Sequence, residues 1–193
     1  MAKSLVFLIL LMNALPWKTL CEPSIIYKLI NIECKSSLGF SANPNCYLKA
    51  INWNKAVAQM DVDVTRLLNN ISLRFHVSKK DYSNKYQPFL INVLVNICDV
   101  LSKRNFLPYG IMFKKVAKEF SNFNHSCPYK GHLFARGFYL DGKVLPNQFP
   151  LGIYKVNVTI LEGYTNKPSD YVGAVIAYFQ VMQPFKKNKN NKS

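Results

Sequence analysis

The side chains that could support catalysis or bind metal are few, and they match no known catalytic motif. The histidines are His76, His125 and His132, and His76 falls on the polar side of an alternating stretch. Asp61 and Asp63 are two residues apart, so on a strand they share one face and resemble a carboxylate pair. We interpret them as solvated surface residues. The sequence has no Gly-x-Ser-x-Gly elbow, His-Glu-x-x-His pair or phosphate-binding glycine loop. We therefore expect no enzyme activity, no metal site and no cofactor.

Four cysteines, Cys34, Cys46, Cys98 and Cys127, are the residues most able to form covalent links. They allow three pairings, and the sequence alone does not choose among them. We favour Cys34–Cys46 and Cys98–Cys127, because each pair brackets a short excursion between predicted strands. Loop entropy then predicts stabilisation of about 3 and about 3.5 kcal/mol. A zinc site is the weaker alternative, since no Cys-x-x-Cys motif occurs.

The first residues have the pattern of a secretory signal peptide, which we place at 1–21. Lys3 precedes an uninterrupted apolar run over residues 5–12, and Pro16 follows before a predicted cleavage near Cys21. The run is shorter than the ~20 apolar residues that span a bilayer, so a membrane anchor is the weaker alternative. An even number of remaining cysteines suits an oxidising compartment. We expect a secreted, extracellular protein.

Three acceptor sequons agree with this route: Asn70-Ile-Ser72, Asn124-His-Ser126 and Asn157-Val-Thr159. Each falls on a predicted polar strand face or in a loop. We expect all three asparagines to be exposed and at least one to carry a glycan.

Alternating apolar and polar residues predict an all-β fold for the single domain at 22–185. The predicted strands are 27–35, 46–53, 56–67, 71–78, 89–97, 131–140, 152–161 and 171–182. Their length and spacing predict a two-sheet antiparallel β-sandwich, and we expect the strand at 89–97 to supply a core face. Residues 186–193 are low in complexity and are expected to be disordered.

One helix interrupts the strands after Pro108. Its apolar stripe consists of Tyr109, Phe113, Val116, Ala117 and Phe120, with Lys114, Lys115 and Lys118 opposite. We expect it to dock over an edge of the sandwich, as a lid between the two cysteines of the second bridge. A helix lying on a membrane surface would show a similar pattern.

The chain is strongly basic, with a net charge of +15. Removing Lys3, Lys18 and the four lysines of residues 186–193 leaves +9 for residues 22–185. Nucleic acid is not an expected partner, because the chain is predicted to be secreted and lacks an arginine cluster. Anionic lipid, proteoglycan and simple solubility all fit, and the sequence does not separate them.

Two stretches, Phe89–Asp99 and Phe120–Tyr129 with its Asn-His-Ser-Cys-Pro-Tyr motif, resemble a large insect family of small secreted proteins described as a domain of unknown function. Asn31–Cys34, Cys46–Lys49 and Leu145–Tyr154 extend the resemblance over nearly the whole mature chain. That family is similar to the ML lipid-recognition superfamily, and some of its members are chemosensory proteins of taste hairs. The resemblance implies an ML- or immunoglobulin-like sandwich with an apolar ligand between its sheets, and it transfers no catalytic residues. Cys21 and the lysine-rich tail depart from the pattern.

Two functions follow as hypotheses. The first is a carrier of an apolar small molecule or lipid, with these candidate pocket residues: Phe75, Phe89, Val93, Phe113, Phe120, Phe138, Tyr154 and Phe179. Each of them taken singly is more typical of an ordinary core. The second is a secreted interaction protein with a closed core, which acts through its surface on a receptor or channel.

Overall fold

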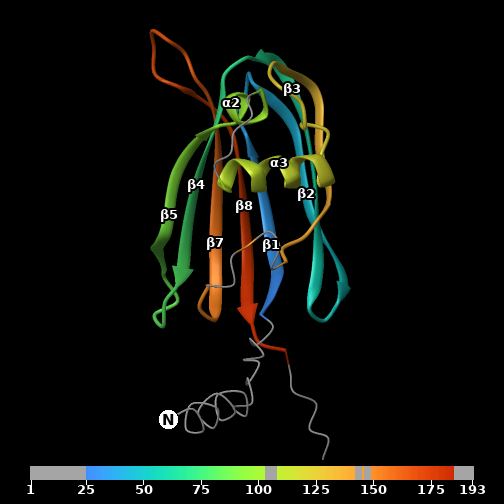
Figure 1. Ribbon diagram of the computed structural model, residues 1–193, viewed down its shortest axis with the longest axis vertical. Coiled ribbons are helices and arrows are strands. Elements are labelled where there is room, and N and C mark those ends of the chain that lie inside the picture. The colour runs from blue at the N-terminus through green and yellow to red at the C-terminus, as the bar shows by residue number, and fades with distance from the viewer. Residues whose placement is uncertain (1–24, 103–107, 142–144, 146–148, 185–193) are drawn as a thin grey trace, which may run out of the picture.

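The computed structural model describes residues 25–102, 108–141, 145 and 149–184, which form two antiparallel sheets and two short helices (Figure 1). The predicted signal peptide at 1–21 and the tail at 186–193 lie outside the described residues.

The larger sheet has five strands. In spatial order they are β1 (Ile26–Ser36), β8 (Asp170–Met182), β7 (Gly152–Glu162), β4 (Ile71–Lys80) and β5 (Tyr86–Asn96). The smaller sheet consists of β2 (Ser41–Asn52), β3 (Lys55–Leu68) and β6 (Tyr129–Phe138), in that order. The predicted antiparallel β-sandwich is thus confirmed, and each predicted strand corresponds to one observed strand.

The alternation in β7 has the predicted register. Tyr154, Val156 and Val158 contribute to the interior, and β7 pairs with β8 and β4 on either side. Asn157 therefore points to the outer face. A shift of one residue would exchange the two faces, so the pattern of bulky residues specifies the register.

The strand predicted to supply a core face lies at a sheet edge, and its Phe89 and Ile91 pack against the lower cluster. β5 pairs only with β4, and β7 occupies the centre of the larger sheet. β5 also ends one residue early, because Ile97 begins helix α2 (Ile97–Ser102). The Asn96 side chain caps this helix by accepting a hydrogen bond from the Asp99 amide at 3.1 Å. An apolar strand pattern does not tell a central strand from an edge strand.

Buried residues form two clusters at different levels of the sandwich. The lower cluster includes Tyr27, Phe149, Tyr154, Phe179 and Val181. The upper cluster includes Leu68, Ile71, Leu73, Ile97 and Tyr129. The interior is therefore densely packed at both ends.

Both predicted disulfides are present. Cys34–Cys46 joins β1 to β2 and so links the two sheets, with a Cα–Cα distance of 5.8 Å. Cys98–Cys127 joins α2 to the segment before β6, with a Cα–Cα distance of 5.3 Å. Both distances lie in the range normal for disulfides.

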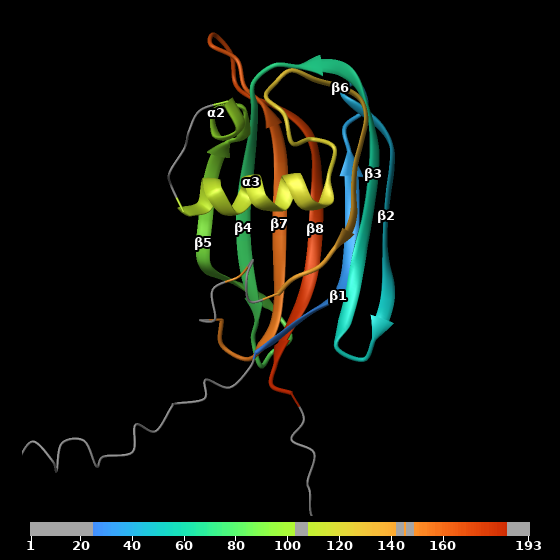
Figure 2. The same ribbon diagram turned by 45° about the vertical axis from the view of Figure 1, so that its right-hand side comes forward.

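Helix α3 (Pro108–Phe120) runs across the strands rather than along them (Figures 1 and 2). Ala117 is buried, Phe113 and Phe120 are partly buried, and Lys114, Lys115 and Lys118 are exposed. The predicted apolar stripe is confirmed for the side chains that the structure describes, which do not include that of Tyr109. Phe120 anchors the end of α3, with its ring centroid 5.6 Å from those of both Phe138 and Tyr139.

Candidate functional site

The most informative region of the interior is the middle of the five-stranded sheet. Five apolar side chains there face the interior yet remain partly exposed, and we name them the mid-sheet band: Phe75, Val156, Val158, Val175 and Ala177. They are neighbours across three strands, because Phe75 pairs with Val158, Val158 with Val175, and Val156 with Ala177.

Exposure changes along these strands, although Ile160 on β7, at the level of Leu73, is partly exposed as well. On β4, Leu73 and Val77 are buried on either side of the partly exposed Phe75. On β8, Phe179 and Val181 are buried directly beyond Ala177. The inward residues of central strands are normally buried when two sheets pack face to face. The middle of this sheet is therefore less closely covered than the lower cluster.

Apolar side chains from α3 and the smaller sheet face the same interior. They are also partly exposed, and they comprise Phe113, Val116, Phe120, Met60, Leu133 and Phe138. The Phe113 ring lies 6.5 Å from that of Phe123, in the segment that follows α3. The region thus has an aliphatic wall on the larger sheet and an aromatic wall on α3 and β6.

The predicted pocket residues divide into three groups. Phe75, Phe113, Phe120 and Phe138 are partly exposed and border the region just described. Tyr154 and Phe179 are 0% and 1% exposed, and together with the partly buried Phe89 they belong to the lower cluster. Val93 is 40% exposed on the edge strand β5.

Sequence reasoning missed the aliphatic members of the mid-sheet band, Val156, Val158, Val175 and Ala177. The available signal was their position on the inward side of predicted strands. Only the comparison of burial along each strand separates them from ordinary core residues.

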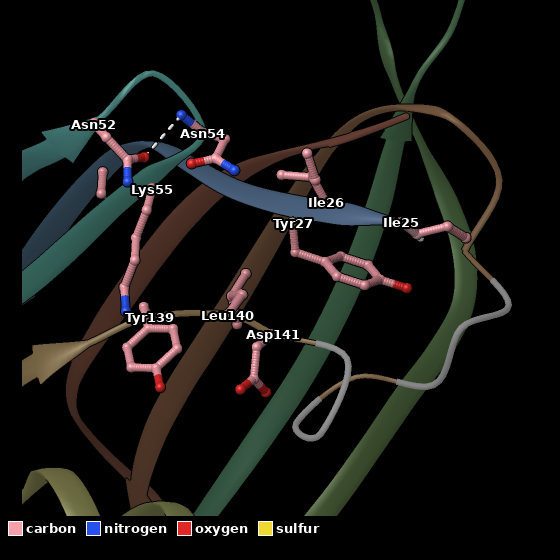
Figure 3. Close-up of a pocket in the computed structure, with 10 residues that line it drawn as sticks. Ile25, Ile26, Tyr27, Asn52, Asn54, Lys55, Tyr139, Leu140 and Asp141 are labelled. Carbon is pink, nitrogen blue, oxygen red and sulfur yellow. Dashed lines mark hydrogen bonds between the residues drawn. The ribbon is translucent and has the colours of Figure 1, made fainter. Parts of the chain in front are cut away.

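A concavity of about 350 Å³ opens where β1, the β2–β3 hairpin and the end of β6 meet (Figure 3). Its lining includes Ile25, Tyr27, Asn54, Lys55 and Tyr139. The Lys55 ammonium lies 3.5 Å from the centre of the Tyr139 ring, a cation–π contact. Burial raises the pKa of Tyr27. Tyr139 also contacts Phe120, so one aromatic side chain borders both this concavity and the anchor of α3.

The residues that resembled a catalytic pair lie on the outer face of the smaller sheet. His132 on β6 bonds Asp63 through Nδ1 at 3.0 Å and Asp61 through Nε2 at 3.2 Å. Ionised carboxylates only accept, so both ring nitrogens donate when His132 is an imidazolium. Hydrogen bonds from Asn43 and His132 lower the pKa of Asp63. Arg136 pairs with Asp61 at 3.2 Å.

This arrangement is a surface network of polar contacts that joins β3 to β6. Asp61 and Asp63 lie on the outer face, as expected, but their partner His132 was not foreseen, because the pairing spans about seventy residues of sequence. Among the described residues, no group of three or more histidine, cysteine, aspartate or glutamate side chains has an arrangement that could hold a metal ion.

A buried carboxylate positions the upper end of the site. Glu162, 3% exposed, accepts hydrogen bonds from the amides of Asn69 at 2.9 Å and Asn70 at 3.2 Å. The Asn70 side chain accepts a 2.6 Å hydrogen bond from Asn96, the cap of α2. Glu162 thus ties the β3–β4 turn to β7, and Asn70 ties that turn to α2.

The three sequons differ in their surroundings. Asn124 is exposed in the loop between α3 and β6, and Asn70 is exposed but bonded to Asn96. Asn157 lies on the outer face, as its register predicted, but it is only partly exposed there. Its Oδ1 is buried and lacks a hydrogen-bond partner within the described residues, where it is paired in register with His76 and Ile176. The expectation of a freely exposed Asn157 therefore does not hold.

Comparison with known proteins adds one family match. Residues 73–156 match a family model described as "Protein of unknown function (DUF1091)". A DUF1091 domain thus occupies this part of the chain. It begins in β4, includes α2, α3 and β6, and ends within β7, so it contains most of the elements around the mid-sheet band. A search of curated proteins finds no match to the chain.

Proposed function

We propose that the protein is a non-enzymatic carrier of an apolar small molecule, such as a lipid, a sterol or a hydrocarbon-like chemosensory cue. The ligand lies between the two sheets, against the mid-sheet band and beneath α3. This proposal also gives the DUF1091 segment a role, since that segment supplies α3 and one side of the ligand space.

One observation carries the proposal: inward apolar side chains in the middle of the larger sheet remain partly exposed, while those of the lower cluster are fully buried. Exposing such residues to water is unfavourable, at about 25 cal/mol per Å² of apolar surface. A ligand of matching apolar surface would remove that cost. The expected similarity to the ML superfamily remains a prediction, and it favours the same location for the ligand.

Helix α3 acts as the lid in this proposal. The Cys98–Cys127 bridge joins α2 to the segment that follows α3, and the contact of Phe120 with Phe138 holds the end of α3. Phe113 and Val116, nearer the middle of the helix, are only partly buried. Lifting the middle of the helix would expose the mid-sheet band.

Secretion is part of the proposal. The two disulfides are compatible with an extracellular protein, because such bonds persist in oxidising compartments. No helix among the described residues is long and apolar enough to cross a membrane.

Native mass spectrometry of the purified protein, followed by solvent extraction, tests whether apolar ligand is bound. We expect a co-purified lipid-like molecule or saturable binding of the apolar fluorophore N-phenyl-1-naphthylamine. A protein with a closed core that acts only through its surface would show neither.

A filling substitution makes the test specific. Val158→Phe and Ala177→Leu add volume at the mid-sheet band, so we expect them to abolish probe binding with little loss of stability. Val181→Phe is the matched control in the packed lower cluster, and overpacking there should destabilise by about 1–3 kcal/mol. If all three variants destabilise alike, the mid-sheet level is closed core and the proposal is wrong.

A further inference from the structure

We propose that the β2–β3 hairpin and the adjoining part of β1 form a surface that docks on an anionic lipid bilayer. The surface is the hairpin patch, defined by four exposed apolar side chains: Ile30, Tyr47, Ile51 and Trp53. The last three are 53%, 52% and 53% exposed, and Ile30 is 41% exposed. Monomeric proteins rarely expose several large apolar side chains together unless they form an interaction surface.

Two links hold the strands that carry these residues side by side. The Cys34–Cys46 disulfide joins β1 to β2, and the Lys28 ammonium donates a 2.6 Å hydrogen bond to the Trp53 carbonyl. Ile30 lies between these links on β1, and Tyr47 and Ile51 lie between them on β2. The patch therefore follows the seam where the two sheets meet.

The strand segments that carry the patch contain only basic charges, and the nearest acidic residues beyond them are Glu33, Asp61 and Asp141. Residues 26–32 and 45–60 contain Lys28, Lys49 and Lys55 and no acidic residue. Each lysine near an anionic leaflet contributes about 1 kcal/mol of attraction.

The combination of groups favours a bilayer over other anionic partners. A sulfated polysaccharide would be held by the lysines but would give the exposed isoleucines no contact. Tryptophan and tyrosine have an apolar body and a polar edge, and they concentrate at the membrane–water interface. Trp53, at the turn of a hairpin, is placed to enter that interface while the lysines contact lipid headgroups.

Docking in this orientation would bring to the bilayer the concavity between β1, the β2–β3 hairpin and the end of β6. Asn52 and Asn54, on either side of Trp53, both line that concavity, which also contains Lys55 (Figure 3). The inference concerns the surface alone, so it stands or fails separately from the carrier proposal.

The test uses the secreted chain and vesicles of phosphatidylcholine with or without phosphatidylserine. Trp53 is one of two tryptophans, and the other, Trp17, lies in the predicted signal peptide. Tryptophan emission therefore reports directly on the patch. We expect a blue shift with phosphatidylserine vesicles, reversed by salt, and co-sedimentation of the protein with them.

Matched variants locate the contact. Ile51→Ser with Trp53→Ser should weaken vesicle partitioning about tenfold or more, and Lys49→Gln should weaken it only for anionic vesicles. Leu38→Ser is the apolar control, since Leu38 is 100% exposed in the turn at the opposite end of β2. Lys115→Gln, on α3, is the charge control. Neither control should change partitioning, and Trp53→Phe should retain most of it.

Three outcomes would overturn the assignment: an unchanged partition for the Ile51/Trp53 variant, a loss with Lys115→Gln equal to that with Lys49→Gln, or binding to heparin without binding to anionic vesicles. Thermal unfolding of each variant distinguishes a lost contact from a lost fold, and Lys49→Gln alters an exposed side chain that the fold does not need.

Discussion

Tyr154 on β7 stacks on Phe179 of β8, with ring centroids 5.2 Å apart and ring planes inclined by 13°. The two residues are also paired in register between the strands. Both are almost completely buried, so this pair is part of the closed lower cluster and not of a ligand surface. This buried pair is the lower limit of the proposed ligand space.

Phe179→Ala should therefore act on stability alone. Removing a fully buried phenylalanine leaves a cavity and costs about 3–5 kcal/mol of the free energy of unfolding. Chemical denaturation measures this loss. The affinity for an apolar probe, corrected for the folded fraction, should stay the same, and a large drop in affinity would place the ligand in the lower cluster.

Phe113→Ala should lower the affinity for an apolar probe more than it lowers stability, because Phe113 is partly exposed on the inner face of α3. We expect a destabilisation below the about 3–5 kcal/mol of a fully buried phenylalanine, with probe affinity reduced about tenfold. Probe displacement and thermal unfolding, measured together, separate the two effects. Ile111→Ala, at an exposed position of the same helix, is the control and should change neither quantity. If Phe113→Ala also changes neither, α3 is not a lid.

Glu162→Ala should destabilise the fold by about 1–3 kcal/mol, since it leaves the amides of Asn69 and Asn70 without their acceptor. Glu162→Gln keeps an acceptor oxygen and should lose less. Hydrogen exchange at these two amides is the direct measurement. Equal losses for the two variants would mean that the carboxylate acts through its charge rather than through these bonds.

Stability should fall at alkaline pH. Burial raises the pKa of both Tyr129 and Tyr154 to about 12, against 10 in the unfolded chain. Each phenol donates to a backbone carbonyl, that of His125 for Tyr129 and that of Pro150 for Tyr154. A raised folded pKa contributes stability that is fully present below pH 10 and is lost as the pH rises through 12. Denaturation from neutral pH to about pH 11 measures the loss, and Tyr129→Phe with Tyr154→Phe should reduce it.

Among the sequons, Asn124 should carry glycan and Asn157 should not. Asn124 is an exposed loop residue, whereas Asn157 is held on the outer face of the central strand with its Oδ1 buried. Glycopeptide mass spectrometry of the secreted protein gives the occupancy of each site. Substantial glycan on Asn157 would mean that its side chain is displaced from the position seen here.

The sequence by itself determined the features that depend on neighbours along the chain. Alternation placed Tyr154, Val156 and Val158 inward and Asn157 outward, because the two faces of a strand follow a period of two residues. The apolar stripe of α3 followed in the same way from helical periodicity. The two disulfides were favoured because each closes a short excursion between strands. Only the structure chose among the three possible pairings of the four cysteines.

Tertiary structure decided what depends on contacts between distant segments. The pattern in β5 was the same whether the strand was central or at an edge, and only pairing with β4 alone placed it at an edge. His132 bonds Asp61 and Asp63 only because β6 pairs with β3, although about seventy residues of sequence separate them. Burial separated Phe75 from Tyr154, although both are aromatic residues on inward faces, because it depends on what packs against a side chain and not on the side chain itself.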